Sequence, residues 1–267
     1  MYQFNYHKPN TLEEAVALFN GADDGIYIAG GHTLIPTMKL RLAAPTDVID
    51  LAGVDALTGI EVAGGVLKVG AFTCHDEVAN SPVILESLPV LASLAGEIGD
   101  AQVRNRGTLG GSVANSDPAA DYPAAVIGLG ATIHTATRDI PGDEYFKNLF
   151  ETALQPGEII TSIDFPIPER ASYRKFPNPA SRYAVVGVLV ADFAGTIRVG
   201  VTGAGPCAFR ASVIEEVLNA NLDPEAINGV EVPDAGFNSD LHASAEYRAH
   251  LVKVMARRAV ADLLRIS

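Results

Sequence analysis

Two double-glycine segments mark the points where the backbone of this chain can adopt unusual conformations. They read Ala29-Gly30-Gly31-His32-Thr33 and Thr108-Leu109-Gly110-Gly111-Ser112. Consecutive glycines reach conformations that other residues avoid and leave their N–H groups uncovered, and a run of uncovered N–H groups forms an anion site. One such segment is typical of a tight strand-to-helix connection, whereas two could hold the two phosphates of a dinucleotide. Gly64-Gly65 lies between two alternating segments and predicts an ordinary hairpin turn.

Composition narrows the class of protein and of ligand. The 267 residues allow two or three modest domains. A formal net charge of −13 argues against nucleic acid or an anionic membrane as partner, so a phosphorylated ligand must be held by backbone dipoles and a few local cations. Cys74 and Cys207 lack metal-site spacing, and we expect free thiols and no iron–sulfur cluster on this chain alone. We expect no signal peptide and no membrane-spanning segment, hence a cytoplasmic protein.

Hydrophobic patterning divides the chain into three ranges, 1–55, 56–168 and 169–267. The first predicts a small α/β unit that begins with a capping box at Thr11 and Glu14. The expected elements are a helix over 12–20, a strand over 25–29, a helix over 34–42, a strand over 47–51, a hairpin over 60–69, a helical stretch over 83–98 that Pro89 breaks or kinks, strands over 131–135 and 158–165, an antiparallel meander at 173–176, 184–192 and 196–201, and helices over 211–219 and 244–264.

The polar residues around the glycine segments leave two interpretations open. Asn115 and Asp117 follow the second segment, where they could serve a phosphate or a ribose, or form a solvated loop in which Asp residues cap the next helix. His32 could transfer protons, although packing or hydrogen bonding explains it as well. His75 stands at a helix start, where a capping role suffices. The histidines form no metal-binding pattern, and we expect neither a metal site nor a catalytic residue.

With these residues in place, the chain resembles the FAD-binding medium subunit of molybdenum hydroxylases, the multi-subunit relatives of xanthine dehydrogenase and aerobic carbon monoxide dehydrogenase. The resemblance covers essentially the whole chain. It is carried by both glycine segments in order, by Met38-Lys39-Leu40-Arg41-Leu42-Ala43 and by Gly203-Ala204-Gly205-Pro206-Cys207-Ala208-Phe209-Arg210. It implies an α+β fold: two α/β subdomains of the PCMH-type (vanillyl-alcohol-oxidase-like) FAD-binding fold, then a C-terminal domain with a three-stranded antiparallel sheet and helices.

The resemblance also implies a set of FAD contacts. The glycine segments would hold the pyrophosphate, and Asp121 would contact a ribose or the adenosine. Ile160 would line the flavin pocket, Lys175 would lie near the cofactor, and Tyr183 would lie close to the isoalloxazine. The complete set is Ala29, Gly30, Gly31, His32, Thr33, Leu34, Thr108, Leu109, Gly110, Gly111, Ser112, Asp121, Ile160, Lys175 and Tyr183. Where the relatives usually carry basic or small residues, this chain has Pro177 and Pro179. These prolines affect the local backbone near Tyr183 and hence access to the flavin face.

The implied function is electron transfer. A large subunit with a molybdenum cofactor would oxidise the organic substrate, a small [2Fe-2S] subunit would relay single electrons to the FAD of this chain, and a quinone or NAD would be the acceptor. Two alternatives stay open: a self-contained FAD oxidoreductase of the same fold, for which we find no substrate-binding constellation, and a non-enzymatic assembly module that retains the fold.

Overall fold

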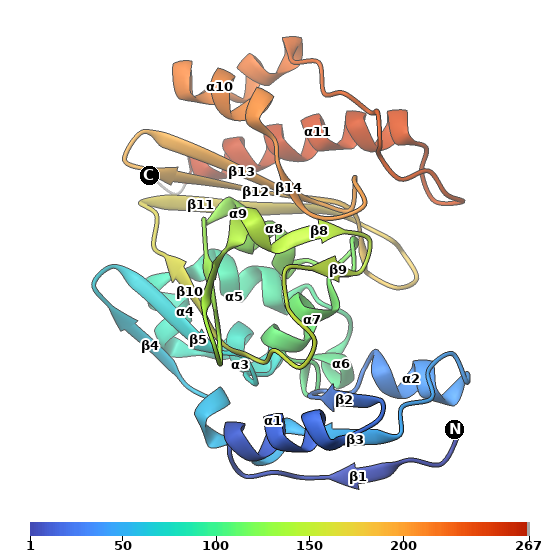
Figure 1. The fold of residues 1–267 in the computed structure, drawn as a ribbon. Coiled ribbons are helices and arrows are strands. Elements are labelled where there is room, and N and C mark those ends of the chain that lie inside the picture. The colour runs from blue at the N-terminus through green and yellow to red at the C-terminus, as the bar shows by residue number, and fades with distance from the viewer. Residues whose placement is uncertain (266–267) are drawn as a thin grey trace.

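The computed structural model describes residues 1–265, and its N-terminal unit is built on a three-stranded parallel sheet (Figure 1). The strand order is β1 (Asn5–His7), β3 (Asp47–Asp50), β2 (Gly25–Ile28), with α1 (Leu12–Gly21), α2 (Leu34–Lys39) and the 3₁₀ turns Leu51–Gly53 and Asp55–Leu57 beside it. The predicted capping box is confirmed: Thr11 accepts the Glu14 N–H at 3.1 Å, and the Glu14 carboxylate accepts the N–H of Asn10 at 2.8 Å. The first glycine segment therefore joins β2 directly to α2.

A second unit surrounds a five-stranded antiparallel sheet. Its strand order is β4 (Ile60–Ala63), β5 (Val66–Gly70), β10 (Ile160–Pro166), β6 (Thr132–Thr135), β7 (Asp139–Pro141), with β8 (Phe146–Asn148) and β9 (Glu151–Thr152) as a separate hairpin. The predicted hairpin over 60–69 is confirmed. The helical stretch divides at Leu88 into α4 (Pro82–Ser87) and α5 (Pro89–Gly96). Pro89 begins the second helix, because its missing N–H costs nothing in a first turn.

Short helices fill the space between this sheet and its neighbours. They are α3 (His75–Asn80), α6 (Ala101–Arg104), α7 (Leu109–Asn115), α8 (Tyr122–Gly128) and α9 (Gly142–Tyr145). Every residue of α8 is buried, and this helix packs on the third sheet. A Cβ added at Gly200 would lie 2.3 Å from the carbonyl oxygen of Ala124, so glycine at this position permits the close approach of α8 to the strand.

The third unit is an antiparallel sheet with helices on its outer face (Figure 1). Its strands are β11 (Arg170–Pro177), β12 (Ala184–Phe193), β13 (Thr196–Thr202) and β14 (Phe209–Arg210), followed by α10 (Ser212–Ala220), the 3₁₀ turn Pro224–Gly229 and α11 (Ala245–Leu263). The expected three-stranded meander is present, and the two-residue β14 adds a fourth strand. Because α8 covers one face and α11 the other, β12 is buried along nearly its whole length. No helix among residues 1–265 is both long and apolar enough to cross a membrane.

Candidate functional site

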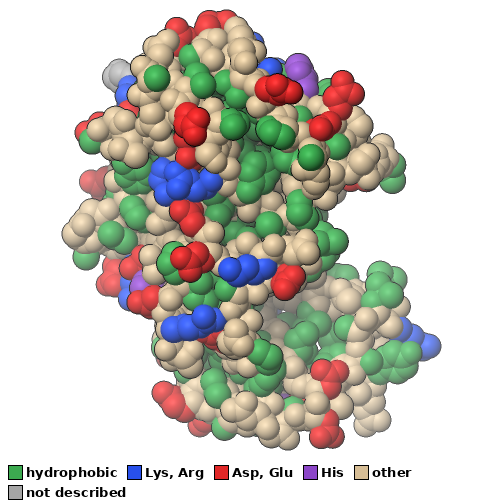
Figure 2. Space-filling view, turned by 45° about the horizontal axis from the view of Figure 1, so that its top comes forward, with side chains coloured by type: hydrophobic (Ala, Val, Ile, Leu, Met, Phe, Trp, Pro, Cys, Tyr) green, Lys and Arg blue, Asp and Glu red, His purple; other side chains and the backbone are tan. Residues whose placement is uncertain are grey.

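A cavity of about 660 Å³ lies between the N-terminal unit and the rest of the molecule. Figure 2 shows the surface hollowed at this junction. Its wall comes from all three units, and it has the size of a site for a large organic ligand. Of the fifteen residues expected at FAD, all line the cavity except Leu109 and Lys175.

The first glycine segment presents a run of free backbone donors to this cavity. Gly31 adopts φ +73°, and a Cβ on Gly30 would lie 2.1 Å from the carbonyl oxygen of Arg106, so neither position accepts a larger residue without strain. Among residues 1–265, no acceptor receives the four successive N–H groups of Gly31 to Leu34. The His32 ring is anchored, with Nδ1 at 3.1 Å from the Gly30 carbonyl oxygen. This segment has the backbone of an anion site.

The second glycine segment is built differently, and the expectation of bare N–H groups there is wrong. It forms the first turn of α7, in which Thr108 caps the Gly111 N–H at 3.1 Å. The Leu109 and Gly110 N–H groups bond to the carbonyl oxygens of Thr73 and Ala71, at 2.9 and 2.8 Å. The glycines serve packing: a Cβ on Gly110 would lie 2.5 Å from that of Ala71. Leu109 is fully buried in the core.

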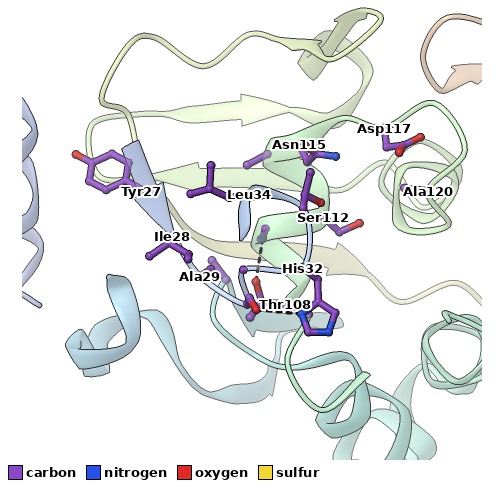
Figure 3. Close-up of a pocket in the computed structure, with 18 of the residues that line it drawn as sticks. Tyr27, Ile28, Ala29, His32, Leu34, Thr108, Ser112, Asn115, Asp117 and Ala120 are labelled. Atoms are coloured by element: carbon purple, nitrogen blue, oxygen red, sulfur yellow. Dashed lines mark hydrogen bonds between the residues drawn. The ribbon is translucent and has the colours of Figure 1, made fainter. Parts of the chain in front are cut away.

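Side chains of α7 supply the polar groups that its backbone does not. Ser112 and Asn115 lie one turn apart, line the cavity, and have no side-chain hydrogen bond within the described part of the chain. Figure 3 shows both beside the first glycine segment, close to Leu34. Asp117 follows them, with one oxygen bound to the Ala119 N–H at 2.9 Å. The sequence pointed to these residues as neighbouring polar groups, and all three line the same cavity.

Asp121 and Lys175 form a buried ion pair at the edge of the cavity. Lys175 Nζ lies 2.9 Å from Asp121 Oδ1, and the Tyr173 hydroxyl donates to the same oxygen at 2.6 Å. Burial raises the pKa of Asp121 to about 6, although Lys175 and Tyr173 oppose that rise. The Asp121 side chain makes no helix-cap hydrogen bond, contrary to the capping alternative. Lys175 does not line the cavity; it donates to the carbonyl oxygens of Glu97 and Arg182 at 3.0 and 3.1 Å.

His75 belongs to the cavity wall, which its sequence position did not indicate. It is 5 % exposed at the first residue of α3, and its Nδ1 has no partner among the described residues. Burial, His32 and Arg104 together lower its pKa to about 4. A neutral imidazole therefore borders the cavity near the first glycine segment at pH 7.

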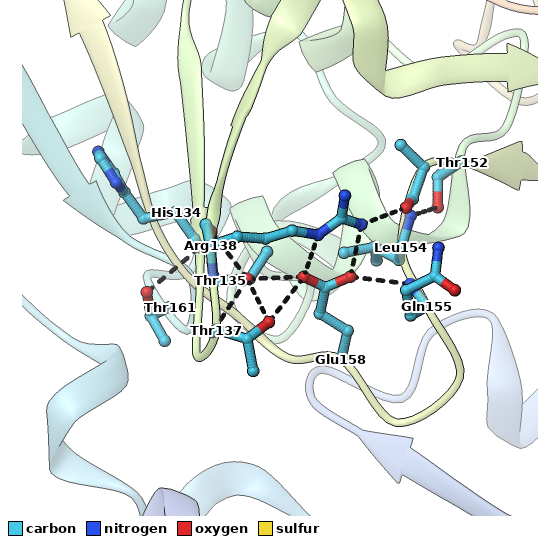
Figure 4. Close-up of polar contacts among 10 residues, drawn as sticks. His134, Thr135, Thr137, Arg138, Thr152, Leu154, Gln155, Glu158 and Thr161 are labelled. Carbon is cyan, nitrogen blue, oxygen red and sulfur yellow. Dashed lines mark hydrogen bonds and ion pairs between the residues drawn. The ribbon is translucent and has the colours of Figure 1, made fainter.

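Glu158 anchors the strand that carries Ile160. Its carboxylate binds Arg138 through two bonds of 2.9 Å and accepts the Thr135 and Thr137 hydroxyls at 2.8 and 3.1 Å (Figure 4). The Arg138 guanidinium lowers the pKa of Glu158 to about 2. Sequence reasoning missed this network because its members come from the β6–β7 turn and from the segment before β10.

The turn between β11 and β12 closes the cavity beside Tyr183. The Asn178 N–H donates to the Tyr183 carbonyl oxygen at 2.8 Å, and the Asn178 side chain accepts the Ala180 N–H at 2.9 Å. Arg182 adopts φ +63° and donates to the Gly99 carbonyl oxygen at 3.1 Å. The segment that contains the two prolines is thus a closed turn, and Tyr183 remains 48 % exposed against the cavity.

These features fit FAD. Four unpaired N–H groups suit an anionic pyrophosphate, the free Ser112 and Asn115 side chains add donors beside them, and the rest of the wall is largely apolar, as a ring system requires. Since FAD is a long molecule, the cavity's extension from the N-terminal unit to Tyr183 also suits it.

Comparison with known proteins identifies the family. Residues 2–168 match the family model for the FAD binding domain in molybdopterin dehydrogenase. The nicotine 6-hydroxylase medium subunit of Paenarthrobacter nicotinovorans is 35% identical, covering 96% of each chain. The carbon monoxide dehydrogenase medium chain of Afipia carboxidovorans is 34% identical, covering 96% of this chain and 95% of that one. A Cu,Mo-CO dehydrogenase crystal structure superposes with a TM-score of 0.91 at 32% identity, covering 98% of both chains. This chain belongs to the FAD-binding medium subunits of the molybdenum hydroxylases.

Proposed function

We propose that this chain relays electrons within a molybdenum hydroxylase complex. A large subunit with a molybdenum cofactor would oxidise the substrate, and a small [2Fe-2S] subunit would pass electrons singly to the FAD held here. Bound FAD supplies the ability to accept electrons singly and release them in pairs to a quinone or NAD. The support is that relatives aligned over nearly the whole chain are named medium subunits or medium chains.

The residues of this chain would bind and orient the cofactor. The N–H groups of Gly31 to Leu34 would hold the pyrophosphate, which explains how a chain of net charge −13 retains an anionic ligand. Ser112 and Asn115 would add hydrogen bonds from side chains that lie beside this segment. Ile160 and Tyr183 would border the flavin, and the buried pair of Asp121 and Lys175 would fix the turn next to it.

The observation that carries this proposal is the run of four amides that find no acceptor in the described part of the chain, in a cavity bordered by all three units. The free thiols of Cys74 and Cys207 support a reducing, cytoplasmic setting. No catalytic side chain of this chain is required.

Spectroscopy and co-purification test the proposal together. The chain, co-expressed with its partners, should carry bound flavin and isolate with a molybdenum subunit and a [2Fe-2S] subunit. Absence of flavin, even after added FAD, overturns the cofactor assignment. A flavin-loaded chain that isolates alone and reduces a dye with a simple substrate is instead a self-contained oxidoreductase.

A further inference from the structure

The backbone of His75 is tied to the second glycine segment and to the residue before it. The His75 N–H donates to the Gly107 carbonyl oxygen at 2.9 Å, and the Leu109 N–H donates to the Thr73 carbonyl oxygen at 2.9 Å. An antiparallel β-bridge lies between these two contacts. The start of α3 therefore runs alongside the second glycine segment, and His75 keeps a fixed place beside it.

Close backbone contacts also bring His75 near the first glycine segment. A Cβ on Gly30 would lie 2.1 Å from the Arg106 carbonyl oxygen and 2.8 Å from the Cα of Gly107. A Cβ on Gly107 would in turn lie 2.5 Å from His75 Nε2. Because neither glycine carries a side chain, the three segments meet directly. His75 Nε2 therefore lies close to the place where the two glycine segments approach each other.

The two ring nitrogens of His75 have different surroundings. Nδ1 is buried and has no hydrogen-bond partner among the described residues. Nε2 also forms no hydrogen bond within residues 1–265, but it is not sealed from solvent, and His75 lines the large cavity. A proton on Nδ1 would be a buried donor without an acceptor, which costs free energy, so the neutral ring carries its proton on Nε2. The ring thus presents an N–H donor to the cavity.

Packing holds the His75 ring in place. The fully buried Tyr122 ring of α8 lies against it, with the ring centroids 5.3 Å apart and the ring planes at 52°. A side chain that is already fixed loses little conformational freedom when a ligand binds, and its hydrogen bond therefore contributes more to affinity.

Resting on the proposed function, we propose that His75 Nε2 donates a hydrogen bond to the pyrophosphate of FAD where the two glycine segments meet. The N–H groups of Leu109, Gly110 and Gly111 already have acceptors within the protein, so a side chain must supply the donor at this side. Nε2 carries a proton in both the neutral and the protonated ring, so the donor is present in either form. A hydrogen bond to a charged phosphate oxygen is stronger than one between neutral groups.

Two amide substitutions test this contact in the full chain freed of FAD. The amide nitrogen of Gln can take the place of His Nε2, whereas the shorter Asn places its amide near the position of Nδ1. His75→Gln should therefore keep the donor, and His75→Asn should lose it. His250→Asn is the control, because His250 is exposed on α11 and does not line the cavity. Fluorescence titration gives the FAD dissociation constants, and phosphorus NMR of bound FAD reports on the pyrophosphate itself.

We expect His75→Asn to raise the FAD dissociation constant by about tenfold or more and to shift a pyrophosphate resonance. His75→Gln and His250→Asn should bind FAD nearly as the unsubstituted chain does. Equal losses in the two His75 variants indicate a structural role and overturn the proposal, as does an unchanged affinity in both. A loss in His75→Asn with unshifted pyrophosphate resonances places the contact on another part of FAD and overturns it too.

A measurement on the unsubstituted chain keeps the test decisive if His75→Asn fails to fold. With ¹⁵N-labelled histidine, the His75 resonances are identified by their absence from His75→Gln. Added FAD should shift the Nε2 resonance of His75, and an unmoved resonance in FAD-loaded protein overturns the proposal. Failure of the unsubstituted chain to bind FAD at all would instead defeat the proposed function itself.

Discussion

Lys175 Nζ lies 2.9 Å from Asp121 Oδ1, and both side chains are almost completely buried. The pair joins β11 to the start of α8. Lys175 also holds the Arg182 carbonyl oxygen at 3.1 Å, which fixes the turn before Tyr183. Lys175, which we expected near the cofactor, therefore does not line the cavity itself. It holds Asp121 and the Arg182 carbonyl oxygen, whose residues do line it.

Lys175→Met should destabilise the chain by about 3–5 kcal/mol, because it leaves Asp121 buried without its cation. Urea unfolding of the FAD-free protein measures this loss. Lys68→Met is the matched control: Lys68 is exposed and lies 4.0 Å from Glu61, and such a surface pair contributes about 0–1 kcal/mol. The double substitution Asp121→Asn with Lys175→Met should recover part of the stability. Equal effects of the two Lys→Met variants would contradict the buried pair.

Gly30→Ala should abolish flavin retention. Its Cβ would lie 2.1 Å from the Arg106 carbonyl oxygen, so the segment must shift and carry its free N–H groups with it. Gly21→Ala, at the end of α1, meets no atom within 4 Å and should leave flavin content unchanged. The ratio of flavin to protein after gel filtration measures both. Full flavin content in Gly30→Ala would remove the first glycine segment from the site.

Ser112→Ala and Asn115→Ala should each weaken FAD binding by about 0.5–1.5 kcal/mol, the net value of one hydrogen bond. Neither should change the free energy of unfolding of the FAD-free chain, since neither side chain has a hydrogen-bond partner among residues 1–265. Fluorescence titration with FAD measures the dissociation constants. The control is Ser87→Ala in α4, whose hydroxyl bonds only to the Val83 carbonyl oxygen. FAD affinities equal to that of Ser87→Ala would place the cofactor elsewhere.

Glu158 should make stability depend on pH in the acid range. Because Arg138 holds the folded-state pKa at about 2, below the ordinary 4.5, the carboxylate contributes stability that is fully present above pH 4.5. That contribution falls as the pH drops from 4.5 toward 2. Glu158→Gln should lower the melting temperature at pH 7 and flatten this acid-side decline. The exposed Glu61→Gln serves as control, and a decline as steep in Glu158→Gln as in Glu61→Gln would contradict this role.

The sequence predicted the features that depend on nearby residues. The capping box at Thr11, the hairpin at Gly64-Gly65 and the break at Pro89 all rest on contacts within a few residues, and all three are confirmed. The first glycine segment also kept its predicted strand-to-helix context. Local chemistry decides each of these elements.

Tertiary contacts decide what the sequence could not show. The second glycine segment became helical because the distant Ala71 and Thr73 carbonyl oxygens accept its N–H groups. The helix at Tyr122–Gly128 entered the sequence analysis only as a helix that Asp residues could cap, without bounds, because it is buried on all sides and so lacks a polar face. Strand β1 depends on pairing with residues 47–49, some 42 positions later in the chain. The division into 1–55, 56–168 and 169–267 stays a prediction.

The most direct test of electron relay is flavin reduction in the assembled complex. The substrate of the co-purified molybdenum subunit is added without oxygen, and the flavin absorbance of this chain is followed with and without the [2Fe-2S] subunit. We predict rapid bleaching in the complete complex and none when the [2Fe-2S] subunit is omitted. Bleaching at the same rate without that subunit, or no bleaching in the complete complex, would contradict the account.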